Sequence, residues 1–185
     1  MRDIADLVVI VWASLFGVSW PWRVTDPDPP RGRVRLSQAE ISASQEREPW
    51  ARAQLAQLAT AAGLRSVPSF GVANAGAYYI PLRHRIQVSH AYLARLSDAE
   101  LRLILAHEVG HATRRWKAFA RRSPDEEVAA DRVALRITGS TPDQWRYAVE
   151  STGRAEPGQI VGEDVVHRAS ALGLQGESCR SSVPK

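Results

Sequence analysis

The chain has 185 residues, of which 44% are hydrophobic and 24% charged, and its net charge is +4. This composition is typical of a folded domain and argues against disorder over most of the chain, and a domain of this length can bury a core without disulfides. The single cysteine, Cys179, excludes an internal disulfide and a multi-cysteine zinc site. The modest positive charge is compatible with a membrane surface or nucleic acid and establishes neither.

The first feature along the chain is an uncharged run at residues 7–22, which contains three tryptophans. As a helix it would span roughly 24 Å, against roughly 30 Å for a bilayer core. Three interpretations stay open: a short membrane anchor over residues 4–22, a signal peptide, and a helix packed on the domain. We expect the anchor. Because more arginines follow the run than precede it, the rest of the chain is then expected in the cytoplasm. The alternative localisation is a soluble cytoplasmic protein.

The remaining organisation follows from proline content and capping signals. We expect a hydrophobic segment at 1–23, a proline-rich linker at 24–36, one folded domain at 37–174 and a flexible tail at 175–185. Helices are predicted at 38–62, 98–117, 124–138, 142–151 and, more weakly, 163–172. Glycines at 63, 139 and 153 stand where C-terminal caps belong. Four capping boxes mark helix starts: Ser37–Glu40, Ser97–Glu100, Ser123–Glu126 and Thr141–Gln144.

Three short segments rich in Val, Ile, Tyr and Phe lie between the first two helices, at 67–73, 77–80 and 85–89. They predict a small antiparallel sheet, so the expected fold class is α+β and mostly helical. His84 and His90 flank the last strand and are expected to be solvated loop residues.

The motif that indicates chemistry is His107-Glu108-Val109-Gly110-His111, an H-E-x-x-H pattern on the helix predicted at 98–117. Residues four apart share one helix face, so the two imidazoles can bind one Zn²⁺. Glu108 projects about 100° away from His107 around the helix, which suits a general base better than a third ligand.

The next helix offers carboxylates at one-turn spacing. Glu127 is expected to be the third zinc ligand, and Asp131 is expected to orient a ligand histidine through its ring N–H. Glu126 is the alternative ligand by position, although its offset from Asp131 does not give the one-turn spacing.

Together these motifs, with Asn74-Ala75, Arg85-Ile86-Gln87-Val88-Ser89 and Leu96-Ser97-Asp98-Ala99-Glu100-Leu101 before them, resemble the HtpX and CAAX prenyl endopeptidase family over roughly residues 67–138. These proteins are zinc-dependent gluzincins and are usually membrane-associated. The resemblance implies a zincin-like domain with one Zn²⁺ per chain. It also implies His107, His111 and Glu127 as metal ligands, Glu108 as catalytic base, and Asp131 as the residue that supports the ligands.

The implied function is hydrolysis of peptide bonds in a protein or peptide substrate, by a zinc metalloendopeptidase whose general base is Glu108. The alternative is a low-activity or latent zinc-bound regulatory or scaffold domain at the membrane. Candidate stabilisers of the oxyanion are His167, Tyr147, Tyr78 and Tyr79. About fifty residues follow Asp131, and we expect them either to cover the cleft or to complete the substrate pocket.

A basic cluster lies at the end of the motif helix, at Arg114, Arg115, Lys117, Arg121 and Arg122. We interpret it as charge that complements the helix dipole and a solvated loop. No nucleic-acid partner is expected, since the aromatic residues are not interleaved with this cluster.

Overall fold

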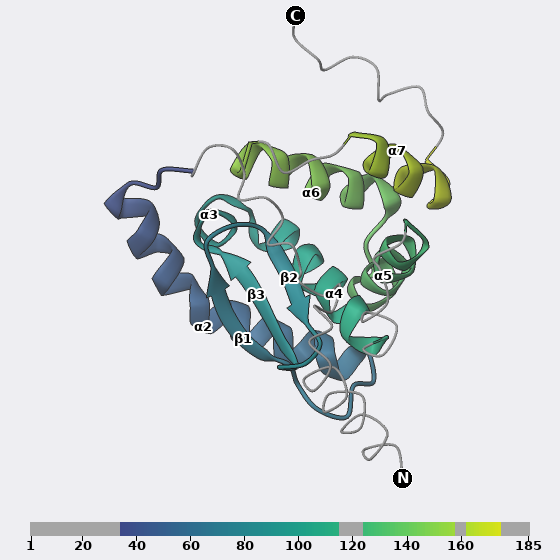
Figure 1. Cartoon of the computed structure of the whole chain (residues 1–185), viewed down its shortest axis with the longest axis horizontal. Helices are drawn as coiled ribbons and strands as arrows, with labels where there is room; N and C mark the ends of the chain where they lie inside the picture. The colour runs from purple at the N-terminus through teal and green to yellow at the C-terminus, as the bar shows by residue number, and fades with distance from the viewer. Residues whose placement is uncertain (1–33, 115–123, 158–161, 175–185) are drawn as a thin grey trace, which may run out of the picture.

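The computed structural model describes residues 34–114, 124–157 and 162–174, and side chains of the last range from residue 165. Helices surround one small sheet, and the α+β class expected from the sequence is confirmed (Figure 1). The elements in chain order are α2 (Gln38–Ala61), β1 (Ser69–Ala73), β2 (Ala77–Ile80), β3 (Arg85–Ser89), α3 (His90–Arg95), α4 (Asp98–Thr113), α5 (Pro124–Thr138), α6 (Pro142–Ala155) and α7 (Gly162–Ala171).

The sheet is mixed, so the expectation of a purely antiparallel sheet was wrong. The strand order is β1-β3-β2. β2 and β3 pair antiparallel as a hairpin, with Tyr79 opposite Ile86, whereas β1 and β3 pair parallel, with Phe70 opposite Ile86. β2 therefore forms one edge of the sheet, and β3 lies between β1 and β2 and runs in the same direction as β1.

The helix starts follow the capping signals. Ser37, Ser97 and Thr141 each form the reciprocal capping box with the residue three positions on. Ser123 lies outside the described residues. Gly63 and Gly139 adopt positive φ just after α2 and α5, as C-terminal caps do.

One helix end was predicted wrongly, and one helix was not predicted. Gly153 does not end a helix but lies inside α6, which continues to Ala155. The short helix α3 was missed. It begins directly after β3, where the Ser89 side chain accepts a hydrogen bond from the Tyr92 N–H.

The two histidines expected in solvated loops are half-buried and have partners. His84, at φ 44°, closes the β2–β3 turn with its Nδ1 2.9 Å from the Tyr79 hydroxyl. His90 opens α3 with its Nδ1 2.8 Å from the Ser44 hydroxyl. Both residues therefore help to hold the fold together.

Helix α4 lies at the centre of the core and contacts α2, α5, α6, β2 and β3. It packs beside β2, with α2 across the sheet and α6 and α7 at the upper edge of the view (Figure 1). The largest hydrophobic side chains that are almost completely buried come from α2, β3, α3 and α4: Leu55, Leu58, Ile86, Val88, Leu93, Leu101, Leu105 and Val109. A helix buried on so many sides is a rigid support for the motif that it carries.

Among the described residues, no helix is both long and apolar enough to cross a membrane. The hydrophobic segment, most of the proline-rich linker and the tail expected from the sequence lie outside those residues.

Candidate metal centre

The last two turns of α4 present the two motif histidines to each other. The Nε2 atoms of His107 and His111 lie 3.1 Å apart, and the rings meet edge to face with centroids 4.7 Å apart. Both side chains are buried or nearly so. The one-turn spacing predicted from the sequence therefore places two imidazole nitrogens around a common point.

Helix α5 supplies a carboxylate to the same point. Glu127 Oε2 lies 3.2 Å from His107 Nε2, and Glu127 Oε1 lies 3.5 Å from His111 Nε2. The two helices can approach this closely because Gly110 has no side chain. A Cβ built there would lie 2.7 Å from the Ala130 carbonyl oxygen.

The three ligand atoms fit a divalent metal ion of zinc type. One atom from each of His107, His111 and Glu127 falls within 4.8 Å of the others. Glu127 Oε1 is buried and has no hydrogen-bond partner, which leaves a charged oxygen that a cation would satisfy. Two imidazoles and one carboxylate are a ligand set that catalytic zinc sites use.

The electrostatics of the site also favour a cation. Burial by itself would lower the pKa of His107, but the carboxylates of Asp131, Glu127 and Glu108 outweigh burial and raise that pKa to about 10. Burial would raise the pKa of Glu127, but the adjacent imidazoles of His107 and His111 hold it well below its ordinary value. Three carboxylates thus converge on two histidines, and the excess negative charge stabilises a positive ion.

Glu108 lies beside the histidines as a buried carboxylate. Its side chain is 4% exposed, and its Oε2 has no hydrogen-bond partner. Its charge contributes to the raised pKa of His107, so it lies within electrostatic reach of the site. A buried carboxylate with one unpartnered oxygen at this position is able to accept a proton.

Asp131 lies one turn after Glu127 and is completely buried. Its Oδ1 lies 2.7 Å from His107 Nδ1. With Nδ1–H donating to this carboxylate, Nε2 is the ring nitrogen of His107 that faces His111 and Glu127 and that would bind a metal ion. The structure thus brings together the five residues singled out in the sequence, from α4 and α5 alone.

Sequence reasoning missed two further residues around Asp131. The Trp145 indole N–H of α6 donates to Asp131 Oδ1 over 2.8 Å, and Arg168 of α7 donates to both carboxylate oxygens. A signal for Trp145 existed, because a buried tryptophan usually needs an acceptor for its N–H. No local pattern distinguished Arg168 from the other arginines.

Other candidates lie outside the cluster. Arg114 donates to Glu126 over 2.8 Å, so the alternative ligand faces an arginine. Tyr147 is 59% exposed and lies under Arg154, and His167 is exposed on α7. Within the described part of the chain, neither Tyr147 nor His167 hydrogen-bonds a residue of the cluster. Tyr79 is buried with its hydroxyl beside His84, and Tyr78 is more exposed.

The sequence model of peptidase family M48 matches residues 45–121, which include α4 and its H-E-x-x-H motif. The match covers less than half of the chain and ends before α5. Over that segment it supports peptidase family M48, a family of zinc metallopeptidases, without separating HtpX from CAAX prenyl endopeptidases. No curated protein and no solved structure matched the chain.

Proposed function

We propose that this protein is a zinc-dependent endopeptidase that binds one Zn²⁺ per chain through His107, His111 and Glu127. The observation that carries the proposal is that one ligand atom from each of these three residues lies within 4.8 Å of the others. Glu108 is buried beside the two histidines on α4. The M48 match over the motif segment supports the same class. The substrate is a protein or peptide.

The chain's own residues supply binding, orientation and proton transfer. Asp131 holds the His107 ring so that Nε2 faces the site, and Glu108 takes a proton from the attacking water and passes it to the leaving amine. A zinc ion, when bound, supplies Lewis acidity that lowers the pKa of water and polarises a peptide carbonyl. Burial of the site strengthens each of these electrostatic interactions.

We also propose that the protein associates with membranes through residues 4–22, with the catalytic domain in the cytoplasm. The uncharged run with three tryptophans and the arginines that follow it support this proposal.

Substitutions in the motif test the assigned roles. Glu108→Gln keeps the size of the side chain but cannot act as a base, so it is expected to retain one zinc per chain and to lose at least about 100-fold in cleavage rate. His111→Ala removes a ligand and should lose both zinc and cleavage. Elemental analysis and digestion of a peptide library measure the two quantities.

Adjacent carboxylates on α5 provide a matched pair. Glu127→Gln should weaken zinc binding strongly, whereas Glu126→Gln removes the partner of Arg114 and should leave zinc content unchanged. Wild-type cleavage by Glu108→Gln would refute the role of Glu108. Zinc retention without any cleavage by the wild type would favour the regulatory or scaffold alternative. Less than a tenth of an equivalent of zinc in metal-replete protein would refute the metal site itself.

A further inference from the structure

One carboxylate joins the metal site to α7, the last helix in the described part of the chain. Asp131 Oδ1 lies 2.7 Å from His107 Nδ1 and also accepts from the indole of Trp145 and from Arg168 Nη2, both within 2.8 Å. Its Oδ2 accepts from Arg168 Nε at 2.8 Å. The guanidinium of Arg168 on α7 therefore binds the same carboxylate that orients His107.

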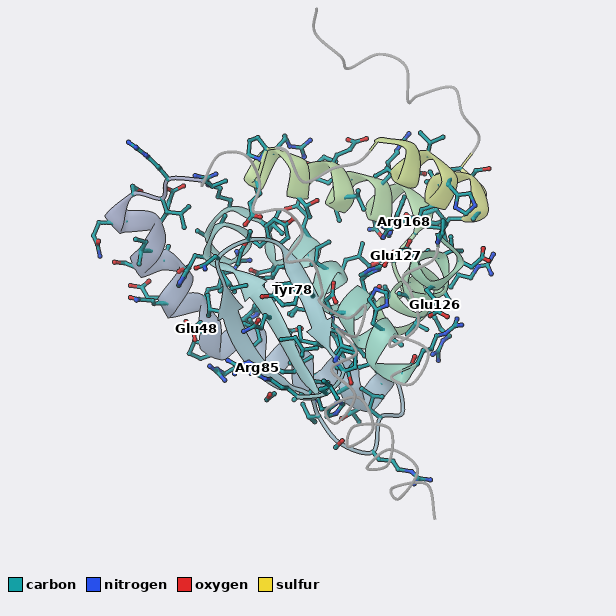
Figure 2. All side chains as sticks on the ribbon, viewed as in Figure 1. Glu48, Tyr78, Arg85, Glu126, Glu127 and Arg168 are labelled. Carbon is teal, nitrogen blue, oxygen red and sulfur yellow. The ribbon has the colours of Figure 1, made fainter. Side chains whose placement is uncertain are left out.

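Arg168 is held in place on several sides. Its side chain is 13% exposed, and its guanidinium carbon lies 5.2 Å from the centre of the Trp145 ring. Its Nη1 lies 3.7 Å from Glu127 Oε2. One side chain from α7 thus reaches both carboxylates that α5 directs at the site, and Figure 2 shows Arg168 beside Glu127.

This arrangement has a physical reason. A completely buried carboxylate is costly unless it is paired and its lone pairs are satisfied. His107 and Trp145 each supply one donor to Oδ1, and Arg168 Nε supplies the donor to Oδ2. The two parallel donors of a guanidinium also fix the plane of a carboxylate, which a single donor does not. The fixed plane keeps Oδ1 on His107.

We propose that Arg168 is a positioning residue for the zinc site: it acts through Asp131 on the orientation of His107 and makes α7 part of the metal centre. This inference rests on the zinc site of the proposed function. The segment after Asp131 would then support the metal ligands, which differs from covering the cleft or lining the substrate pocket. The difference can be measured, because support of the ligands changes zinc affinity in the absence of substrate.

The test compares zinc affinity, by competition with a chromophoric chelator, across variants of the full chain. Arg168→Gln should weaken Zn²⁺ binding about tenfold, in the range known for residues that support metal ligands. Arg132→Gln is the matched control, because Arg132 also joins α5 to α7, through a 3.3 Å bond to the Ala171 carbonyl, without touching Asp131. The control should bind zinc within about twofold of the wild type.

Two further measurements separate positioning from general stability. Arg168→Lys keeps the charge but cannot donate two parallel hydrogen bonds to the Asp131 carboxylate. Its zinc affinity should therefore remain several fold below that of the wild type. It also serves as the test if Arg168→Gln does not fold. In a double-mutant cycle, Asp131→Asn should remove most of the effect of Arg168→Gln, because one residue acts through the other. The visible spectrum of the Co²⁺-loaded protein should change in the Arg168 variants and not in Arg132→Gln.

The outcomes are distinct for the two proposals. Unchanged or tighter zinc binding by both Arg168 variants, or effects of Arg168 and Asp131 that simply add, would overturn the positioning role and leave the peptidase proposal standing. An equal loss of affinity in Arg132→Gln would show that α7 docking alone matters. If the wild type itself binds no zinc, the proposed function and this inference both fall.

Discussion

Gly110 is the residue on which the geometry of the metal site depends most directly. A Cβ at this position would lie 2.7 Å from the carbonyl oxygen and 2.8 Å from the Cα of Ala130, which are backbone atoms that cannot rotate away. Helices α4 and α5 must therefore separate if any side chain is introduced. Since α4 carries the histidines and α5 carries Glu127, separation would also spread the ligand atoms.

We expect Gly110→Ala to lower the free energy of unfolding by about 1–3 kcal/mol, as overpacking does, and to lower Tm by roughly 2–12 °C in a chain of this size. Zinc affinity should fall as well. Gly153→Ala makes the same chemical change inside α6 and is the control, for which unchanged zinc affinity is expected. Wild-type zinc affinity in Gly110→Ala would contradict the close packing of α4 on α5.

For individual residues, the sequence predicted those positions of the site that depend only on the i, i+4 spacing within one helix. The spacing of His107 and His111 requires only helical geometry, and so does the spacing of Glu127 and Asp131. Trp145 and Arg168 could not be predicted in the same way, because their positions depend on how α6 and α7 pack on α5. The role suggested for His167, stabilisation of the oxyanion, is a different one and stays a prediction.

At the scale of elements, helix starts were predicted better than helix ends or strand pairing. A capping box is a local contact between residues three apart, so Ser97 and Glu100 mark a start wherever the helix packs. The parallel pairing of β1 with β3 joins residues 16 positions apart and depends on which strand takes the sheet edge. α3 was missed because its six residues carry no periodic pattern long enough to detect.

One capping contact predicts a pH effect. Hydrogen bonds from Arg95 and Ser37 lower the pKa of Glu40 from 4.5 to about 2. Because the pKa in the folded state is below that in the unfolded chain, this contact contributes stability above about pH 4.5 and loses it as the pH falls toward 2. A carboxyl titration by NMR should show Glu40 titrating near pH 2.

Removal of the arginine partner tests the cause. In Arg95→Leu the pKa of Glu40 should rise toward its ordinary value, and acid unfolding should begin at higher pH. Arg146→Leu removes an arginine that pairs with Asp143 on α6 and should leave the titration of Glu40 unchanged. If Glu40 still titrates near pH 2 in Arg95→Leu, Arg95 is not the cause and Ser37 alone lowers the pKa of Glu40.

For the whole molecule, the fold class followed from capping signals and local composition, whereas the assembly of the site from separate segments did not. His107 and Asp131 are 24 positions apart in the chain, and Asp131 and Arg168 are 37 apart. Contacts over such separations arise from packing of the complete domain, which no local window contains.

Membrane association is tested on the whole chain. The full-length protein should fractionate with membranes, and deletion of residues 1–23 should release it, because the uncharged run lies within that segment. Deletion of residues 175–185 at the other end is the control and should not change the fractionation. An intact, soluble full-length chain would favour a packed helix, and a mature form that begins near Trp20 would favour a signal peptide.

The dependence of Asp131 on Arg168 also has a consequence for the order in which the parts of the metal site form during translation. A ribosome releases α4 and α5 first, so the histidines and Glu127 emerge well before Arg168 does. Until α7 follows, the nascent domain has Asp131 without the guanidinium that grips it. With Arg168 in the positioning role proposed above, the growing chain therefore acquires its full metal affinity only after α7 has left the ribosome and packed on α5.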